Sequence, residues 1–368
     1  MSQATPTRPL GEAARTVPVD ACRSPWPQSR WRALPSLRTL TALCDLAMRW
    51  LIGTHSAALG ARLRWNGFRS AYVQTAAGRL RYFEHRAPKP GPTWVFVHGI
   101  ASQATDWTPL LRRVARRGGR VLALDLPGHG ASDTLPRGAG PEVLQSAVNE
   151  AMELLLGPGE TCKAVANSMG GLGAIRFAQG HPRRVEQLIL ISPLGAPMSD
   201  TQRRGVLDRF VLDSHARALG FVDRLFVNGF NRTAWLPRFC TDALHAVMRQ
   251  SYALAISAVL RQPHLQALVH HVRTHPLLEE DDLKELPPTL LIWGAKDQFL
   301  PEACADFFQR GLPDAVVHRP ADYRHVPFLD RADHLETLIQ GWVRDREASA
   351  TSSPRCAGAG LPDAGRAT

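Results

Sequence analysis

The chain has 368 residues, of which 44% are hydrophobic and 21% are charged, so it is long enough to bury a sizeable core and is not a small disulfide scaffold. Its formal net charge of +11 is concentrated in the first 86 residues, which hold 13 Arg, no Lys and only 4 acidic residues. A basic segment can meet a membrane, a nucleic acid or an acidic partner. No nucleic-acid-binding motif accompanies these arginines, so we expect no nucleic-acid partner.

The two ends of the chain and its N-terminal extension differ from the rest in pattern. Residues 1–35 and 347–368 are rich in small and polar residues without hydrophobic period, and we expect both to be disordered. Within the extension 36–69, residues 37–53 (LRTLTALCDLAMRWLIG) predict an amphipathic helix. It is too short and too charged to cross a bilayer. It either packs on the protein's own surface or makes a peripheral membrane contact.

The cysteines are spread along the whole chain without any C-x-x-C pair, which argues against a zinc site or a dithiol redox motif. We expect reduced thiols, no metal, no cofactor and a cytoplasmic location, peripheral to a membrane if residues 37–53 bind one.

From residue 70 onward the pattern is that of an α/β protein. Residues 71–86 (AYVQTAAGRLRYFEHR) predict a β-hairpin that turns at Ala77-Gly78. Short, continuously apolar runs then alternate with helix-length segments, as expected of a mostly parallel sheet with helices on both faces. These runs are TWVFVHG, RVLALDL, CKAVANS, VEQLILIS, PTLLIWG and AVVHRPA. The alternation of strands and helices is interrupted over 196–286, where the hydrophobic residues follow a helical period. We interpret this segment as a cap inserted between core segments 70–195 and 287–346.

Polar residues follow the predicted strands in a consistent order. In open α/β sheets, ligands bind beyond the carboxyl ends of the strands. The residues found there are His98-Gly99-Ile100, Asp125 to Gly130 (DLPGHG), Asn167 to Gly171 (NSMGG), Gly294 to Pro301 (GAKDQFLP) and Tyr323-Arg324-His325. A serine, an acid and a histidine therefore occur in the order Ser, Asp, His.

On these motifs the chain resembles an α/β-hydrolase from about residue 70 to residue 345. The resemblance implies Ser168 as the nucleophile, His325 as the base and Asp297 as the acid that orients the histidine. It also implies that the backbone N–H groups of Ile100 and Met169 form the oxyanion hole. The alternatives are an N-cap role for Ser168 and a helix-capping role for Asp297. The remaining histidines of these motifs fit structural roles.

Two features depart from the usual pattern of the family. Ala166 stands where the nucleophile turn usually has a glycine, and we expect its methyl group to be tolerated because the position requires only a small side chain. Asn167 and the residues after it resemble the G-N-S-M-G-G form of hydrolases that cleave carbon–carbon bonds in aromatic ring-fission products. However, HGIASQATDW (98–107) replaces the glycine-rich loop of that subgroup, which favours carboxylic esters.

The cap segment is mostly apolar and is interpreted as the specificity element. Its large residues either line an acyl pocket or hold the cap together, and Trp107 is a candidate wall of that pocket. An apolar cap with a basic amphipathic helix favours a small-molecule ester or lipid-like substrate, cleaved through an acyl-enzyme on Ser168. The alternatives are carbon–carbon bond hydrolysis or acyl transfer with the same triad, and a non-catalytic ligand-binding relative.

Overall fold

The computed structural model describes residues 57–135, 141–226 and 278–352, with individual residues between 246 and 269. The segments 1–35 and 37–53 and part of the cap, for which we made predictions above, lie outside the described residues. The described residues all belong to one contact unit, Cys44–Thr368. Among them, no helix is long and apolar enough to cross a membrane.

The sheet begins with the hairpin predicted from the sequence. Its turn is formed by residues 76 and 77, one position earlier than predicted, because Gly78 already pairs with Thr75 in the ladder. The two strands are antiparallel to each other, and the second runs antiparallel to its other neighbour, β4. They are β1 (Arg69–Thr75) and β2 (Gly78–Arg86).

Six further strands are parallel to one another and correspond to the six apolar runs. They are β3 (Thr93–Val97), β4 (Arg120–Leu124), β5 (Cys162–Asn167), β6 (Val185–Ile191), β7 (Thr289–Ile292) and β8 (Val316–His318). The sheet order is β1-β2-β4-β3-β5-β6-β7-β8. Strands β3 to β5 are buried along their whole length, which explains why their sequences are mostly apolar, with Arg120 and Lys163 as the charged exceptions. The predicted α/β architecture is confirmed.

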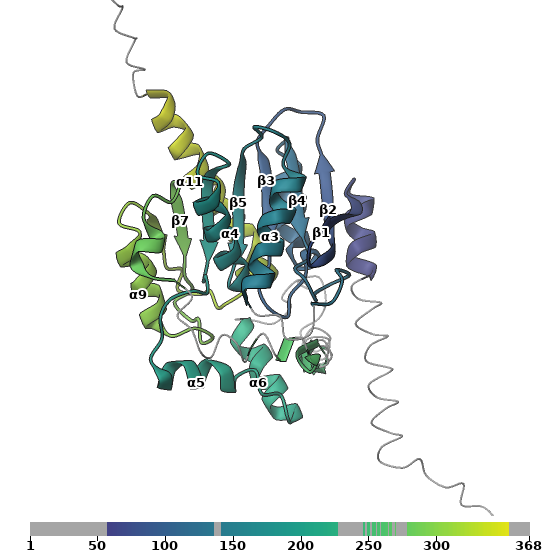
Figure 1. Cartoon of the computed structure of the whole chain (residues 1–368), viewed down its shortest axis with the longest axis vertical. Coiled ribbons are helices and arrows are strands. Elements are labelled where there is room, and N and C mark those ends of the chain that lie inside the picture. The colour runs from purple at the N-terminus through teal and green to yellow at the C-terminus, as the bar shows by residue number, and fades with distance from the viewer. Residues whose placement is uncertain are drawn as a thin grey trace, which may run out of the picture. The chain divides into compact units, whose positions relative to one another are not determined.

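Helices lie on both faces of this sheet. Figure 1 shows α3 and α4, which pack on each other, in front of the strands, while α2 packs on α11. The helix α11 continues to Ser352, past the predicted end of the ordered core at residue 346, because Glu347 and the alanines that follow favour helix. The helices are α2 (Thr108–Ala115), α3 (Pro141–Leu155), α4 (Met169–Gly180), α9 (Glu302–Gly311), α10 (Pro327–Asp330) and α11 (Ala332–Ser352).

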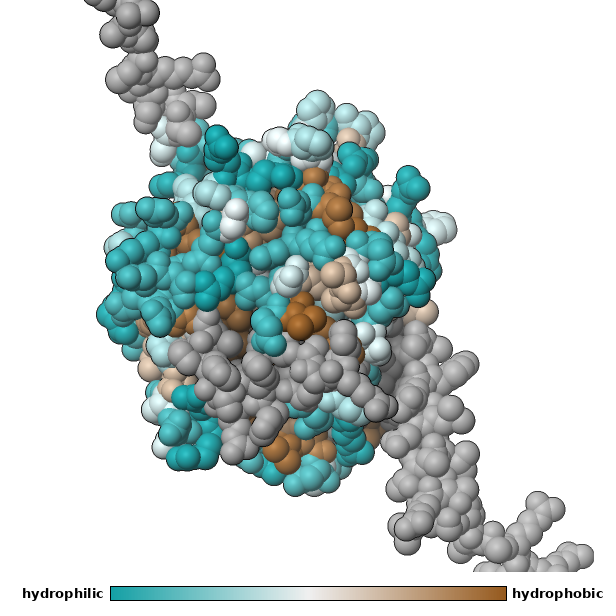
Figure 2. All heavy atoms as spheres, in the orientation of Figure 1, coloured by the Kyte–Doolittle hydropathy of each residue, from teal (hydrophilic) through white to brown (hydrophobic). Residues whose placement is uncertain are grey.

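The described part of the predicted cap is helical. It contains α5 (Asp200–Asp208), α6 (His215–Leu225), helical residues between 246 and 269, and the short 3-10 helix η2 (Glu280–Leu283). The Ser199 side chain accepts a hydrogen bond from the Gln202 N–H and thereby starts α5 with a capping box. Figure 1 shows α5 and α6 beyond one end of the strands. In Figure 2 the described surface in view is mostly hydrophilic, with hydrophobic residues in separate patches.

Candidate active site

Asp297 and His325 form a buried pair at the ends of β7 and β8. The His325 Nδ1 lies 2.9 Å from Asp297 Oδ2, and the side chains are 4% and 0% exposed. The other carboxylate oxygen, Oδ1, accepts the Phe299 N–H at 2.7 Å. Burial by itself would raise the pKa of Asp297, but the His325 ring and these hydrogen bonds hold it below its ordinary value. Asp297 therefore stays ionised and orients the imidazole.

Ser168 lies between β5 and α4 in a strained backbone conformation. Its φ of 52° and ψ of −121° are unusual for a residue with a side chain and cost about 1 to 3 kcal/mol. The Ser168 N–H donates to the Ile191 carbonyl, and the Leu194 N–H donates to the Ser168 carbonyl, which together hold the turn. Ser168 occupies the N-cap position of α4, but its side chain makes no capping hydrogen bond to the helix. Helix capping by the hydroxyl therefore does not account for this serine.

The glycines around Ser168 are required by close backbone approach. A Cβ atom on Gly99 would lie 2.9 Å from Ser168 Cβ, and one on Gly170 would lie 2.4 Å from the His98 carbonyl oxygen. Ala166, in contrast, is a fully buried residue of β5, paired with Val97 and Leu190, and its methyl group is accommodated in the core. The family's glycine at this position is replaced without disturbing the strand.

His98 holds the peptide that carries one predicted oxyanion-hole donor. Its Nε2 accepts the Leu126 N–H at 3.0 Å, so the ring proton is on Nδ1, which donates to the Gly99 carbonyl at 2.7 Å. Because the carbonyl and N–H of a trans peptide point in opposite directions, this bond turns the Ile100 N–H away from His98. Burial lowers the pKa of His98 to about 4, which keeps the ring neutral. Met169 begins α4, so its N–H has no acceptor within the helix.

Asn167 links the strand that carries Ser168 to the loop that carries His325. Its Nδ2 donates to the Ile191 carbonyl at 2.9 Å and to the His325 carbonyl at 3.1 Å. The side chain is 1% exposed, so its two N–H groups are satisfied by these carbonyls rather than by solvent. The sequence suggested Asn167 only as a subgroup marker, and its contact with His325 required the tertiary structure.

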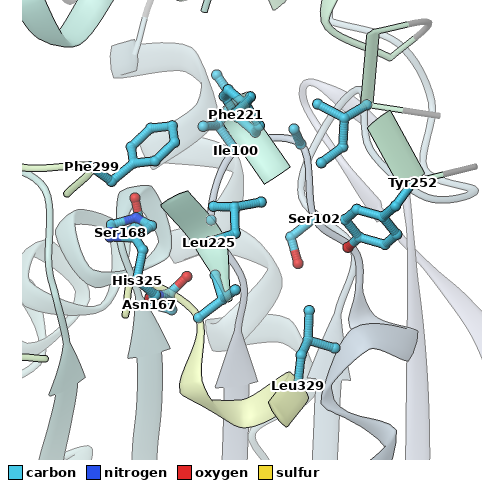
Figure 3. A pocket seen from close by; sticks show the side chains of 14 residues that line it. Ile100, Ser102, Asn167, Ser168, Phe221, Leu225, Tyr252, Phe299, His325 and Leu329 are labelled. Atoms are coloured by element: carbon cyan, nitrogen blue, oxygen red, sulfur yellow. The ribbon is translucent and has the colours of Figure 1, made fainter. Parts of the chain in front are cut away.

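Ser168 and His325 open into one pocket between the strand ends and the cap (Figure 3). Its volume is about 420 Å³, part of which is open to solvent. The described lining is mostly apolar: Gly99, Ile100, Ala101, Ser102, Asn167, Ser168, Phe221, Leu225, Tyr252, Ile256, Phe299, His325, Val326 and Leu329. Within the described ranges, no group of three His, Cys, Asp or Glu side chains is arranged to hold a metal ion.

Trp107 does not line this pocket, so its prediction as a pocket wall is corrected. It is fully buried and stacks on Phe328 with ring centroids 3.8 Å apart, and it also contacts Phe96. The 3-10 helix η1 (Ala104–Trp107) packs on the sheet and on α10, so the indole lies in the core.

Several lining residues were not predicted from the sequence. Phe299 stacks on the His325 ring at 4.9 Å, and Ser102 lies on the loop that precedes η1. Phe299 stands two residues after Asp297, a spacing that could have suggested it. Among the apolar cap residues, Phe221, Leu225, Tyr252 and Ile256 line the pocket, whereas Phe230, Trp235 and Phe239 lie outside the described residues.

The fold and this constellation define the class of the protein. The family described as alpha/beta hydrolase fold matches residues 92–332, and the chain belongs to it. A 2-hydroxy-6-oxononadienedioate/2-hydroxy-6-oxononatrienedioate hydrolase from Paraburkholderia phymatum is 29% identical over 73% of this chain and 94% of its own length. A pimeloyl-acyl-carrier-protein methyl ester esterase from Aromatoleum aromaticum is 30% identical over 69% of this chain and 98% of its own length.

The solved structures are similar in fold. A membrane phospholipase A has a TM-score of 0.65 and 23% identity, covering 84% of this chain and 97% of that chain. An esterase from Exiguobacterium antarcticum has a TM-score of 0.57 and 19% identity, covering 75% of this chain and all of that chain. The fold is thus that of α/β-hydrolases with esterase and lipase-like members.

Proposed function

We propose that the protein is a serine hydrolase that cleaves a carboxylic ester with an apolar acyl group through an acyl-enzyme on Ser168. One observation supports the proposal most directly. Ser168, whose backbone is strained, and His325, whose Nδ1 is hydrogen-bonded to the buried Asp297 carboxylate, line the same apolar pocket. A serine hydroxyl is a poor nucleophile unless a base lies within reach, and this arrangement supplies both base and orientation.

Acylation uses the ring nitrogen of His325 that faces away from Asp297. The His325 Nε2 takes the Ser168 proton as Oγ attacks the ester carbonyl carbon. The hydrogen bond between nucleophile and base is often long in a free enzyme and tightens with substrate bound. The imidazolium then gives its proton to the leaving alkoxide oxygen as the carbon–oxygen bond breaks. An alcohol leaves and the acyl group stays on Ser168.

Deacylation repeats these steps with water. His325 takes a proton from the water, the hydroxide attacks the acyl carbon, and the Ser168 oxygen leaves with the proton held by the imidazolium. Asp297 stabilises the imidazolium in both halves without accepting its proton. The N–H groups of Ile100 and Met169 would bind the negative oxygen of each tetrahedral intermediate, and removal of one such donor typically costs about 100- to 1,000-fold in rate.

The substrate class is proposed from the pocket and from the relatives. None of the described lining residues is Lys or Arg, so this part of the pocket wall offers no permanent positive charge to a carboxylate, and most of it suits a hydrocarbon chain. One relative is named a methyl ester esterase. A lipid-like ester reached through a peripheral contact of residues 37–53 extends this proposal. Loss of liposome flotation on deletion of residues 1–60 is the expected result, and unchanged flotation would contradict it.

Carbon–carbon bond hydrolysis is the second candidate. It is favoured by the relatives named 2-hydroxy-6-oxononadienedioate hydrolases and by Asn167, which precedes the serine in the similar motif. The dicarboxylate in that name fits poorly in a described lining without Lys or Arg. Comparing the rates on such a ring-fission product and on simple esters distinguishes the two reactions.

Active-site labelling tests the main proposal. A fluorophosphonate probe should label the wild-type protein and not the S168A variant, with p-nitrophenyl esters of increasing acyl length turned over only by the wild type. The control variant Ser257→Ala removes a hydroxyl that bonds to the Ala253 carbonyl outside the pocket lining, and it should be labelled normally. Equal labelling of folded S168A would favour a non-catalytic relative. Product analysis with added alcohol separates hydrolysis from acyl transfer.

A further inference from the structure

Phe299 lies where the cap meets the catalytic triad. Its ring stacks on the His325 ring with centroids 4.9 Å apart, and its backbone N–H donates to Asp297 Oδ1 at 2.7 Å. Phe210 and Phe221 of the cap pack edge to face on the same ring, with centroids 5.2 and 4.9 Å away. Figure 3 shows Phe299 on the same side of the pocket as His325. Phe299 therefore contacts both the cap and the pair that activates the nucleophile.

Arg209 binds Phe299 from the cap by a hydrogen bond. It directly follows Asp208, the last residue of α5, and its Nη1 donates to the Phe299 carbonyl. Phe299 is 3% exposed, so a donor from the protein, rather than solvent, satisfies this carbonyl. The two polar groups of the Phe299 backbone therefore serve different partners. The N–H holds the triad acid Asp297, and the carbonyl is held by Arg209.

The charge of Arg209 is not neutralised by an ion pair. Among the described residues Arg209 forms no salt bridge, whereas the cap arginines Arg217 and Arg249 are each paired with an aspartate. Burial, chiefly, and the nearby Arg224 lower the pKa of Arg209, and the negative charge of Asp297 opposes this change. A guanidinium stays protonated at neutral pH. Arg209 therefore places a positive charge close enough to Asp297 to act on it.

The other ionisable groups around Asp297 leave Arg209 as a separate positive charge. Burial, chiefly, and the charge of Asp297 raise the pKa of Cys304 to about 12, so this thiol is uncharged at neutral pH. The Arg224 Nη1 donates to the Gly220 carbonyl at 2.8 Å, which holds this second guanidinium on α6. The His325 ring is bonded to Asp297 through Nδ1 and becomes positive only during the reaction.

We propose that Arg209 is a positioning residue that links the cap to the catalytic triad. Its hydrogen bond fixes the Phe299 peptide, so that the Phe299 N–H holds Asp297 and the Phe299 ring holds the His325 imidazole in the orientation for proton transfer. Its positive charge acts on the same pair. The inference rests on the proposed ester hydrolysis, in which His325 takes the Ser168 proton. Because Arg209 does not belong to the described pocket lining, it affects the rate of the chemical step rather than the choice of substrate.

Substitution of Arg209 in the full-length protein tests the link. Arg209→Ala should lower kcat for a p-nitrophenyl ester about 10- to 100-fold, because a small misplacement of base and acid is costly. KM and the preferred acyl length should change little, and the rate of Ser168 labelling by a fluorophosphonate should fall in parallel. The acidic limb of kcat/KM against pH, where the base becomes protonated, should move to higher pH because a charge that opposes the imidazolium has been removed.

Two further variants separate positioning from a merely structural role. Arg209→Lys keeps a positive charge and a donor, and it should restore most of the activity and the wild-type acidic limb. Arg204→Ala removes an exposed arginine of α5 whose Nη2 lies 3.5 Å from Thr201 Oγ1, and this matched control should behave as the wild type. Circular dichroism checks folding, and Arg209→Gln, which removes the charge but keeps a donor, replaces Arg209→Ala if that variant does not fold.

The outcomes for the link and for the proposed function are distinct. A folded Arg209 variant with the wild-type kcat, or with a lowered kcat and an unchanged acidic limb, would overturn the link between the cap and the triad. Absence of Ser168-dependent labelling and ester hydrolysis in the wild type would overturn the proposed function instead.

Discussion

The two sides of the pocket are built differently. On the strand side, each reacting residue is held by hydrogen bonds to backbone or to a buried charge, as in the pairs of Asn167 with the His325 carbonyl and of Asp297 with the His325 ring. On the cap side, Phe221 and Leu225 meet the pocket through apolar contacts, with Phe221 packed edge to face on Phe210 and Phe299. Hydrogen bonds have fixed directions and apolar packing does not. We therefore expect the strand side to determine the chemistry and the cap side to determine which substrate fits.

Removal of the charge on Asp297 tests the strand side most strongly. We expect Asp297→Asn to lower kcat about 10,000-fold, because the amide stabilises the wrong imidazole tautomer and not the imidazolium. Steady-state kinetics on a p-nitrophenyl ester measures the change, with thermal unfolding as the control for folding. A loss smaller than tenfold would mean that Asp297 is not the partner of His325 during the reaction.

Truncation on the cap side should change stability and selectivity more than chemistry. Phe221 is 2% exposed, so Phe221→Ala should lower the free energy of unfolding by about 3 to 5 kcal/mol and shift the preferred acyl length upward. Phe210 belongs to the same aromatic cluster but does not line the pocket. Phe210→Ala is thus the matched control, with lower stability and the wild-type length preference. Equal shifts in both variants would contradict the assignment of Phe221 to the pocket wall.

The buried carboxylate of Asp106, in the 3-10 helix η1, predicts a pH-dependent stability. The folded-state pKa of Asp106, about 6, exceeds its ordinary value of 3.8, so the folded protein holds a proton that the unfolded chain has released between these values. The free energy of unfolding therefore falls as pH rises through this window, by about 3 kcal/mol in all. Asp106→Asn should be more stable than wild type at pH 8, and this gain should shrink at pH 4. Urea titrations at both pH values measure it.

Loss of the Asn167 amide should slow catalysis moderately. In Asn167→Ala the carbonyls of Ile191 and His325 lose a buried donor, which costs about 1 to 3 kcal/mol and loosens the histidine loop. We expect kcat to fall about tenfold or more while KM changes little, since the amide positions the base and not the substrate. Asn167→Gln is the conservative comparison. A variant with reduced stability and unchanged kcat would show that Asn167 is only structural.

The smallest effect concerns the turn that lacks the family glycine. Because Ala166 is accommodated within β5, Ala166→Gly should leave kcat/KM within about tenfold of wild type. It should also lower the stability by about 0.5 to 1 kcal/mol through the flexibility of glycine in a strand. A gain in activity greater than tenfold would show that the alanine distorts the nucleophile turn.

Much of the fold follows from local pattern. The buried strands are mostly apolar, and the residues that follow them include Ser168, Asp297 and His325 in one order. Parallel strands bring their carboxyl ends to one edge of the sheet. The positions of these residues after the strands were therefore sufficient to predict that they meet at one site. The sequence placed the turn between β1 and β2 and the end of α11 a few residues away from their observed positions. At the ends of strands and helices, neighbouring positions differ little in strand pairing or helix propensity, so the sequence pattern does not fix the boundary.

The sequence alone therefore determined the strands of the sheet and the residues that follow them, and it predicted the inserted cap. These features depend on short-range periodicity. Only the tertiary structure decided that Trp107 packs in the core and that Asn167 holds the His325 loop. It also decided that Ser102 lines the pocket while its hydroxyl donates a hydrogen bond to Asp106. Those contacts depend on how loops and helices are oriented against the sheet. That orientation results from packing among segments far apart in the chain, and no local pattern specifies it.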